Sequence, residues 1–400
     1  MNEKETKHYN IIYPDYDNCI VNLISTILNA YNVQTNHNPL RQLNLNELKS
    51  KRNIVLMIFD GMGYDILKRH TDPNNSFIRS KLIDKINTVY PSTTASVITS
   101  IYTGKTPLEH GVLGWTLYYK EYFRLINILP CIDYMSGEYI NINSINPYKP
   151  FNLHKESIFT KIKENSPDVS QYIITENKII DSHYNKLISE DAKMRGYSIT
   201  DSLYEELRKT IKENDAKKFI LTYASEPDAL IHLQNTGSDW VKDYINEMDK
   251  QIRMLVDKVK GTDTLIFITA DHGLIDIDKY YYNDEDEEFY NCIVLPAFPE
   301  QRFSSFFVKN HKRALFEKYI KNYENDFMFM NRDEFWKKEL LGRGKKHPKI
   351  DDFIGDYLAI AIGDKGIGNF YKSGRTHEFK AHHAGLTEQE MLIPLIKIDV

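Results

Sequence analysis

Seven residues that can take part in metal or nucleophilic chemistry are spread along the chain, each beside an apolar run. Three are aspartates, three are histidines and one is a threonine: Asp60, Thr94, Asp228, His232, Asp271, His272 and His383. Carboxylate, imidazole and hydroxyl groups bind divalent cations, and this number of ligands is enough for two ions. Bound cations would activate the threonine hydroxyl as a nucleophile. The set predicts a two-metal centre built around Thr94.

The segment EPDALIH contains the sharpest local spacing. Asp228 and His232 are four residues apart, so on a helical turn they project from the same face. A carboxylate and an imidazole at this spacing form half of a divalent metal site. The same spacing is also typical of a surface ion pair, so the pair alone does not decide between the two.

Two further segments repeat one layout, an apolar run followed by aspartate. Asp60-Gly61 follows the run NIVLMIF, and Asp271-His272-Gly273 follows DTLIFITA. An aspartate in such a place can simply form a turn. Three aspartates at three strand ends favour a shared cleft, because open α/β sheets bind ligands at the carboxyl ends of their strands.

Two positions keep an alternative open. Thr93 or Thr94 could be the N-cap of the helix that begins near Ala95, and a nucleophile is also favoured there because helix N-terminal amides stabilise anionic oxygens. His383 has a neighbouring histidine, His382, and the spacing does not choose between them as ligand.

The elements that must position these residues alternate along the chain. Residues 53–59, 218–224 and 263–270 are apolar runs that predict strands buried on both faces. Residues 198–214 and 238–260 have helical periodicity with Ser, Thr or Asp at their starts. This alternation predicts an α/β fold with a mostly parallel central sheet and helices on both faces.

The other parts of the chain have a different sequence pattern. We expect residues 104–150 to be a long irregular binding segment and residues 154–165 to be one helix. Trp115, Tyr118 and Tyr119 could stack on a flat leaving group in a substrate pocket, or could simply pack that segment. Beyond Asp278 the pattern predicts a smaller inserted α+β subdomain over residues 284–375. The catalytic core would then comprise residues 1–283 and 376–400.

Composition excludes some classes of protein. The chain has 400 residues, a formal net charge of −5 and three separated cysteines. A slightly acidic chain is not expected to keep a nucleic acid as a stable partner. The sparse cysteines and the polar N-terminus favour a cytoplasmic protein with reduced thiols and no membrane partner. The oligomeric state is not predicted.

Five segments together resemble the alkaline phosphatase superfamily, in its type I phosphodiesterase and nucleotide pyrophosphatase branch. They are FDGMGYD, YPSTTASVITSIYTGKTPLEHGV, EPDALIH, TADHG and HHAGLTEQEMLIPLI, in the order of the family. The resemblance implies a nucleophile at Thr94. It also implies one ion held by Asp60, Thr94, Asp271 and His272, and a second held by Asp228, His232 and His383.

The same resemblance implies the chemistry. Thr94 would attack a phosphoester in line and form a covalent phospho-threonine that water then hydrolyses. Zinc is the usual metal of the family, and a mixed Asp and His shell also suits manganese or iron. The substrate would be a small-molecule phosphoester. One departure concerns nucleotide pyrophosphatases, which have an Asn three residues after the nucleophile where this chain has Val97.

Two alternatives to a phosphodiesterase remain at this stage. A phosphomonoesterase or a phosphonate hydrolase would use the same residues on the same scaffold. A non-catalytic protein stabilised by metal is less favoured, because such relatives lose ligands and none is missing here.

Overall fold

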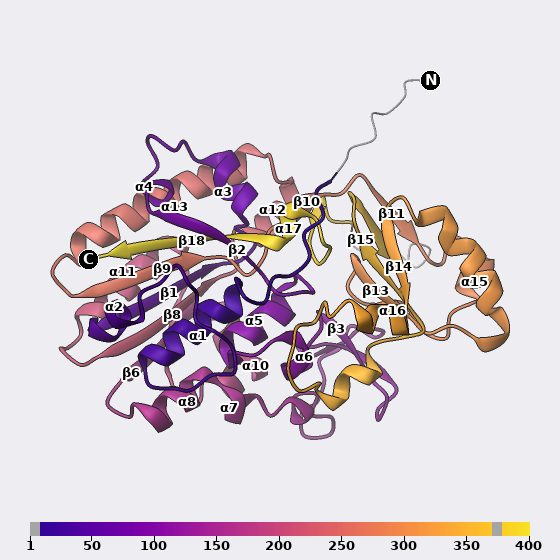
Figure 1. Cartoon of the computed structure of the whole chain (residues 1–400), viewed down its shortest axis with the longest axis horizontal. Helices are drawn as coiled ribbons and strands as arrows, with labels where there is room; N and C mark the ends of the chain where they lie inside the picture. Colours follow the sequence, from indigo (N-terminus) through magenta and orange to yellow (C-terminus); the bar gives the residue numbers. More distant parts are fainter. Residues whose placement is uncertain (1–8, 370–377) are drawn as a thin grey trace.

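A seven-stranded sheet forms the centre of the computed structural model, which describes residues 9–369 and 378–400 (Figure 1). Its strand order is β2–β18–β9–β1–β8–β6–β7. The strands are β1 (Asn53–Phe59), β2 (Leu82–Asn87), β6 (Ser170–Glu176), β7 (Lys193–Tyr197), β8 (Lys218–Ala224), β9 (Thr264–Thr269) and β18 (Leu392–Asp399). Neighbours from β9 to β7 are parallel, whereas β18 is antiparallel to β2 and β9. The predicted α/β class is confirmed.

Helices cover both faces of this sheet (Figure 1). One group contains α1 (Ile20–Ala30), α5 (Thr94–Thr103) and α8 (Ile158–Asn165), with α5 in contact with the other two. The other group contains α3 (Tyr64–His70), α4 (Phe77–Ser80), α11 (Thr200–Lys212) and α13 (Asp239–Lys258), packed around α13. Every residue of β1 is buried between these layers, which explains its uninterrupted apolar sequence.

Helix ends follow their local sequence signals. The Ser238 side chain accepts a hydrogen bond from the backbone N–H of Val241 and so caps α13. Helix α5 ends at Gly104, whose φ of 66° is in the left-handed region that glycine adopts without strain. The remaining helices are α2 (Leu45–Ser50), α6 (Pro107–His110), α7 (Leu153–Glu156), α9 (Asn177–Ile180), α10 (His183–Ile188), α12 (Asp228–Gln234), α14 (Glu287–Tyr290), α15 (Arg313–Ile320), α16 (Arg332–Lys337) and α17 (Glu388–Met391).

Two local expectations were wrong. Residues 104–150 are not irregular throughout, because they contain an antiparallel sheet of β3 (Thr116–Tyr119), β4 (Arg124–Asn127) and β5 (Ile132–Asp133). These strands are too short to show a period in the sequence. Residues 154–165 form two helices, because Ser157 breaks the run and its side chain accepts from the N–H of Phe159 to cap α8.

A second sheet lies apart from the central one. It has the order β12–β13–β15–β14, with β12 (Phe298–Pro299), β13 (Phe303–Phe306), β14 (Phe327–Asn331) and β15 (Tyr357–Ala361). β18 points away from this sheet in Figure 1, so the parallel strands direct their carboxyl ends toward it. This part of the molecule has an apolar cluster of its own, in which Phe316 of α15 packs against Phe289, Phe306 and Tyr357.

Two short ladders link the segments on either side of the second sheet. β10 (Ile275–Asp276) pairs with β17 (Ala381–His382), and β11 (Lys279–Tyr282) pairs with β16 (Lys365–Gly368). The first ladder places the segment that follows β9 next to β17, which contains His382 and is followed directly by His383. Within residues 9–369 and 378–400, no helix has the length and apolar character needed to cross a membrane.

Candidate active site

Three neighbouring strands of the sheet bring three aspartates together. β1 lies between β8 and β9 in parallel register, and Asp60, Asp228 and Asp271 follow these strands. The backbone N–H of Asp228 donates to the carbonyl of Asp60 over 2.9 Å. Gly61 permits this approach, because its φ is 72° and a Cβ there would lie 2.8 Å from Cα of Asp228.

His272 lies at the centre of the first predicted ligand set. Its Nε2 atom is 3.2 Å from Thr94 Oγ1, 3.4 Å from Asp271 Oδ2 and 3.5 Å from Asp60 Oδ1. Ligand bonds of roughly 2.1 Å in a tetrahedral zinc site separate neighbouring ligand atoms by about 3.4 Å. The distances around His272 therefore fit the edges of one tetrahedral site. Its other nitrogen, Nδ1, faces the carbonyl of Gly273 at 3.1 Å.

The second predicted set also converges. Asp228, His232 and His383 offer ligand atoms that all lie within 4.8 Å of one another. Asp228 Oδ2 is 3.2 Å from His232 Nε2, and Asp228 Oδ1 is 3.9 Å from His383 Nε2. His232 Nδ1 is 2.7 Å from the carbonyl of Ala381, which leaves Nε2 for a ligand. Asp60, Asp228 and His272 form a second such group, so the two sets adjoin.

The structure separates the two histidines that the sequence leaves open. His383 points its Nε2 toward Asp228, and its ring stacks on that of His272 with centroids 3.9 Å apart. His382 instead uses its Nδ1 to accept from the backbone N–H of His383 over 2.9 Å. The geometry thus supports His383 as the ligand.

Unpaired oxygens in the cluster show that the cluster suits cations. Asp60 Oδ1, Asp228 Oδ1 and Asp271 Oδ2 are buried without a hydrogen-bond donor in the described part of the chain. An unsatisfied buried polar group costs about 1–3 kcal/mol and a charged one costs more. Bound divalent ions would supply the missing partners, so the residues fit the group that the resemblance implies.

The titration behaviour of the cluster has the same cause. Burial, reinforced by Asp271 and Asp228, raises the pKa of Asp60 well above its ordinary value, and burial also raises the pKa of Asp271. Burial opposes ionisation of Asp228 too, but the neighbouring His232 lowers its pKa overall. Burial and the other imidazoles hold the pKa of His383 well below its usual range. A neutral imidazole is the form that binds a metal.

The two threonines at the start of α5 point to different partners. Thr93 is the N-cap residue by its backbone conformation, and its hydroxyl donates to Glu300 Oε1 over 2.7 Å. Thr94 is the first helical residue and its hydroxyl is next to His272. Of the two, Thr94 therefore has the geometry of a nucleophile held at a helix N-terminus.

Hydrogen bonds from other residues orient the aspartates. The Tyr223 hydroxyl donates to Asp60 Oδ2. Asp271 Oδ1 accepts from the backbone N–H groups of Gly61 at 3.1 Å and of His272 at 2.9 Å. Tyr223 was not predicted, because its only signal in the sequence is its place near the end of a strand beside β1. Glu300 was not predicted either, since nothing in the sequence links residue 300 to residue 93.

The three candidate pocket aromatics have different environments. Trp115 is 39% exposed. Tyr118 packs against Phe298 of the second sheet, with ring centroids 6.1 Å apart. Tyr119 is fully buried and its hydroxyl donates to the carbonyl of Pro147, so its side chain packs within the segment that contains the β3–β5 sheet. Val97 is also fully buried and belongs to the core.

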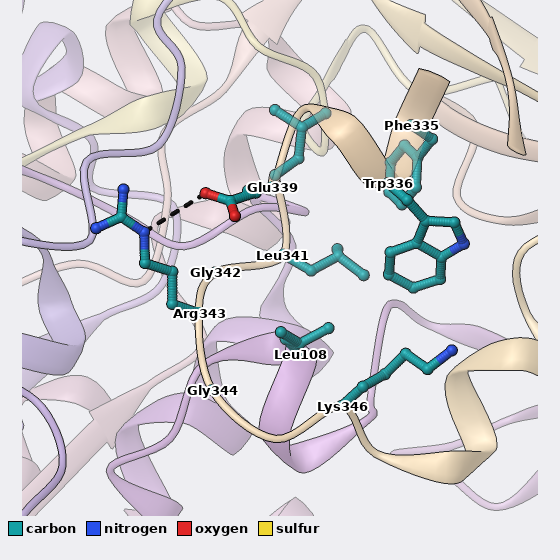
Figure 2. A pocket seen from close by; sticks show the side chains of 10 residues that line it. Leu108, Phe335, Trp336, Glu339, Leu341, Gly342, Arg343, Gly344 and Lys346 are labelled. Atoms are coloured by element: carbon teal, nitrogen blue, oxygen red, sulfur yellow. Dashed lines mark ion pairs between the residues drawn. The ribbon is translucent and has the colours of Figure 1, made fainter. Parts of the chain in front are cut away.

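A separate hollow lies between α6 and the segment that follows α16 (Figure 2). It encloses about 300 Å³, and its lining includes Leu108, Trp336 and Lys346. An ion pair between Arg343 and Glu339 spans 3.5 Å on one side. None of the candidate ligands lines this hollow, so it is not part of the cluster.

Comparison with known proteins agrees with the fold. A model of the type I phosphodiesterase / nucleotide pyrophosphatase family matches residues 54–294, and the chain belongs to this family. No curated protein sequence matches the chain. The family membership supports a hydrolase of phosphoesters or phosphonates.

Solved structures share the fold at low sequence identity. Murine ectonucleotide pyrophosphatase / phosphodiesterase 5 has a TM-score of 0.63 and 14% identity, covering 86% of this chain and 87% of its own. Phosphonoacetate hydrolase from Sinorhizobium meliloti, in complex with phosphonoacetate, has a TM-score of 0.61 and 15% identity, covering 87% and 90%. The murine protein has also been solved in complex with AMP, at a TM-score of 0.62, 14% identity and 86% and 87% coverage.

Proposed function

We propose that this protein is a two-metal phosphodiesterase that acts through a covalent phospho-threonine at Thr94. The observation that carries the proposal is the position of the Thr94 hydroxyl at the start of α5, 3.2 Å from His272 Nε2 of the first ligand set, which adjoins the second. A small-molecule diester is the proposed substrate.

The proposed ligand sets are those that the family pattern implies. Asp60, Thr94, Asp271 and His272 would hold one divalent ion, and Asp228, His232 and His383 would hold the other. When bound, the ions lower the pKa of the threonine hydroxyl and offset the charge of the phosphoryl group. Zinc suits these residues best, and manganese or iron could replace it.

The residues of the chain then have separate roles in the reaction. Thr94 Oγ1 gives up its hydroxyl proton to water and forms a bond to phosphorus while the bond to the leaving oxygen breaks on the opposite side, and the leaving oxygen takes a proton from water. The free N–H groups at the start of α5 donate to the non-bridging oxygens. A water molecule attacks the phospho-threonine in the second step and returns the hydroxyl to Thr94.

We also propose that residues 284–375 are a cap inserted into a core of residues 1–283 and 376–400. The separate four-stranded sheet and its own apolar cluster support this division. The boundary at 375–376 lies outside the described residues. Such a cap would cover the carboxyl ends of the parallel strands and contribute to substrate choice.

The test is hydrolysis of bis-p-nitrophenyl phosphate by zinc-loaded protein. Thr94→Ala should lose more than about a thousandfold in kcat/KM, the scale of losing a catalytic nucleophile. The matched control is Thr93→Ala, whose lost hydroxyl contacts Glu300 and not His272, and which should keep measurable turnover. A Thr94→Ala protein with the wild-type rate would refute the proposal.

A phosphomonoesterase or a phosphonate hydrolase is the second candidate. It is supported by the shared fold of the phosphonoacetate hydrolase. Turnover of p-nitrophenyl phosphate or of phosphonoacetate above that of the diester would favour it. Fewer than two bound ions per chain, together with no hydrolysis of any of these esters, would favour a non-catalytic binding protein.

A further inference from the structure

An acidic residue of the second sheet, Glu300, contacts the segment that carries Thr94. Glu300 lies in the hairpin between β12 and β13, where its backbone N–H donates to the carbonyl of Phe303 over 3.0 Å. The Ser304 hydroxyl donates to the Glu300 carbonyl over 2.9 Å, which fixes the hairpin from the other direction. Glu300 is therefore held on a rigid turn and not on a free loop.

Its carboxylate contacts the segment that carries the nucleophile. Glu300 Oε1 accepts from the hydroxyl of Thr93 at 2.7 Å and from the backbone N–H of Trp115 at 2.6 Å. Thr93 immediately precedes Thr94. Both donors reach the same oxygen, and no donor from residues 9–369 or 378–400 contacts Oε2.

The charges around Glu300 leave it without a strong cationic partner. The ionisable groups that act on it most are His232 and Asp228, both members of the second ligand set. Burial is the main cause that raises the pKa of Glu300 to about 7, and no lysine or arginine is among the groups that act on it most strongly. In its ionised form the carboxylate adds negative charge at the edge of the cluster.

Formal charges show how the Glu300 carboxylate changes the net charge of the metal centre. Three aspartates and an ionised Thr94 would balance the four positive charges of two divalent ions. Glu300 then makes the centre negative by one unit. A diester brings one negative charge to such a centre, whereas a monoester or phosphonate dianion brings two, so the second charge is penalised.

We propose that Glu300 is a specificity-determining residue that disfavours substrates with a second negative charge at the reacting phosphorus. This inference rests on the proposed function, because it concerns which phosphoester the same site accepts. A unit charge acting over about 12 Å at an effective dielectric constant of about 20 corresponds to about a tenfold preference.

The first test compares wild-type protein with Glu300→Gln, which removes the charge and keeps an oxygen to accept from Thr93 and Trp115. For zinc-loaded protein at pH 8.5, the ratio of kcat/KM for p-nitrophenyl phosphate to that for bis-p-nitrophenyl phosphate should rise about tenfold in the variant. Glu324→Gln, an exposed carboxylate of the same part of the chain, is the matched control and should leave the ratio unchanged.

The second test needs no turnover and separates this inference from the proposed function. Calorimetry on zinc-loaded Thr94→Ala protein measures the affinities for phenylphosphonate, a dianion at pH 8.5, and for its monomethyl ester, a monoanion. Adding Glu300→Gln should tighten binding of both ligands, and it should tighten binding of the dianion about tenfold more than binding of the monoanion.

Each outcome of the two tests supports or overturns the role of Glu300, the proposed function or both. An active Glu300→Gln protein with an unchanged substrate ratio, or equal effects on both phosphonates, would overturn the role of Glu300 while leaving the phosphodiesterase intact. Protein that hydrolyses no ester and still shows the charge-selective binding would refute the proposed function and support Glu300. Protein that binds neither phosphonate would overturn both.

Discussion

Arg302 and Glu390 form a two-point ion pair with no exposed surface on either side chain. Arg302 Nε and Nη2 donate to Glu390 Oε1 and Oε2, each over 2.7 Å. Glu390 Oε1 also accepts from the backbone N–H of Gly385 over 2.7 Å. Arg302 belongs to the hairpin that carries Glu300, and Gly385 lies two residues beyond His383. The pair therefore fixes the second sheet against the segment that supplies a candidate metal ligand.

Breaking this pair should be costly. Removing one partner of a buried pair leaves an uncompensated charge, so we expect Arg302→Met to lower the free energy of unfolding by about 3–5 kcal/mol. Urea denaturation of the metal-free protein measures this loss. Asp351→Asn is the control, since its pair with Lys346 is 52% and 42% exposed and should contribute no more than about 1 kcal/mol. Equal losses in the two variants would contradict the expectation.

The hydroxyl of Tyr223 should control metal affinity without binding metal itself. It donates to Asp60 and so orients the free oxygen of that carboxylate toward His272. Loss of such an outer partner typically weakens metal binding 10- to 100-fold, which is the range we expect for Tyr223→Phe. A zinc titration against a competing chelator measures the change. Tyr119→Phe removes a buried hydroxyl that donates to Pro147 and to none of the aspartates, and it should leave zinc affinity as it is.

The two adjacent histidines should differ in metal stoichiometry. His383→Ala removes an imidazole of the second ligand set, so we expect one tightly bound zinc per chain in place of two. His382→Asn keeps an acceptor for the backbone N–H of His383 and should retain both ions. Elemental analysis after dialysis counts them. One ion in the His382 variant and two in the His383 variant would reverse the assignment.

Residues whose role depends on local sequence were predictable. The runs of β1 and β9 are fully buried and that of β8 is buried except at Tyr223, so each stands out in the sequence as an apolar run that a polar or turn residue ends. The aspartates after them follow from the rule that strand ends carry ligand groups. The four-residue spacing of Asp228 and His232 corresponds to one turn of α12.

Residues whose role depends on distant contacts were not predictable. Glu300 and Thr93 are 207 positions apart, and only the folded hairpin brings them together. The strands β3, β4 and β5 have two to four residues each, too few for a period of two to stand out. β7 has the sequence KMRGY, which contains few apolar residues because it is an edge strand with exposed positions.

His110 should make the stability of the protein sensitive to acid. The N–H of Val112 donates to its Nδ1 over 3.0 Å, and its Nε2 lies 2.9 Å from Ser100 Oγ, so the folded protein holds a neutral ring. Burial, with help from His347, lowers its pKa well below the ordinary 6.5. Near pH 6.5 the unfolded chain takes up a proton at this histidine, whereas the folded chain does not. The contribution of the neutral ring to the free energy of unfolding is therefore complete above that pH and is lost as the pH falls below it.

Replacing this ring should remove its share of the acid sensitivity. His110→Asn keeps an acceptor for Val112 but does not titrate. We therefore expect the stability advantage of the wild type over this variant to shrink by up to about 1.4 kcal/mol for each pH unit below 6.5. Urea midpoints at pH 7.5, 6.5 and 5.5 measure it, with the exposed His311→Asn as control. An advantage that stays constant over these three pH values would show that His110 is not held neutral by the fold.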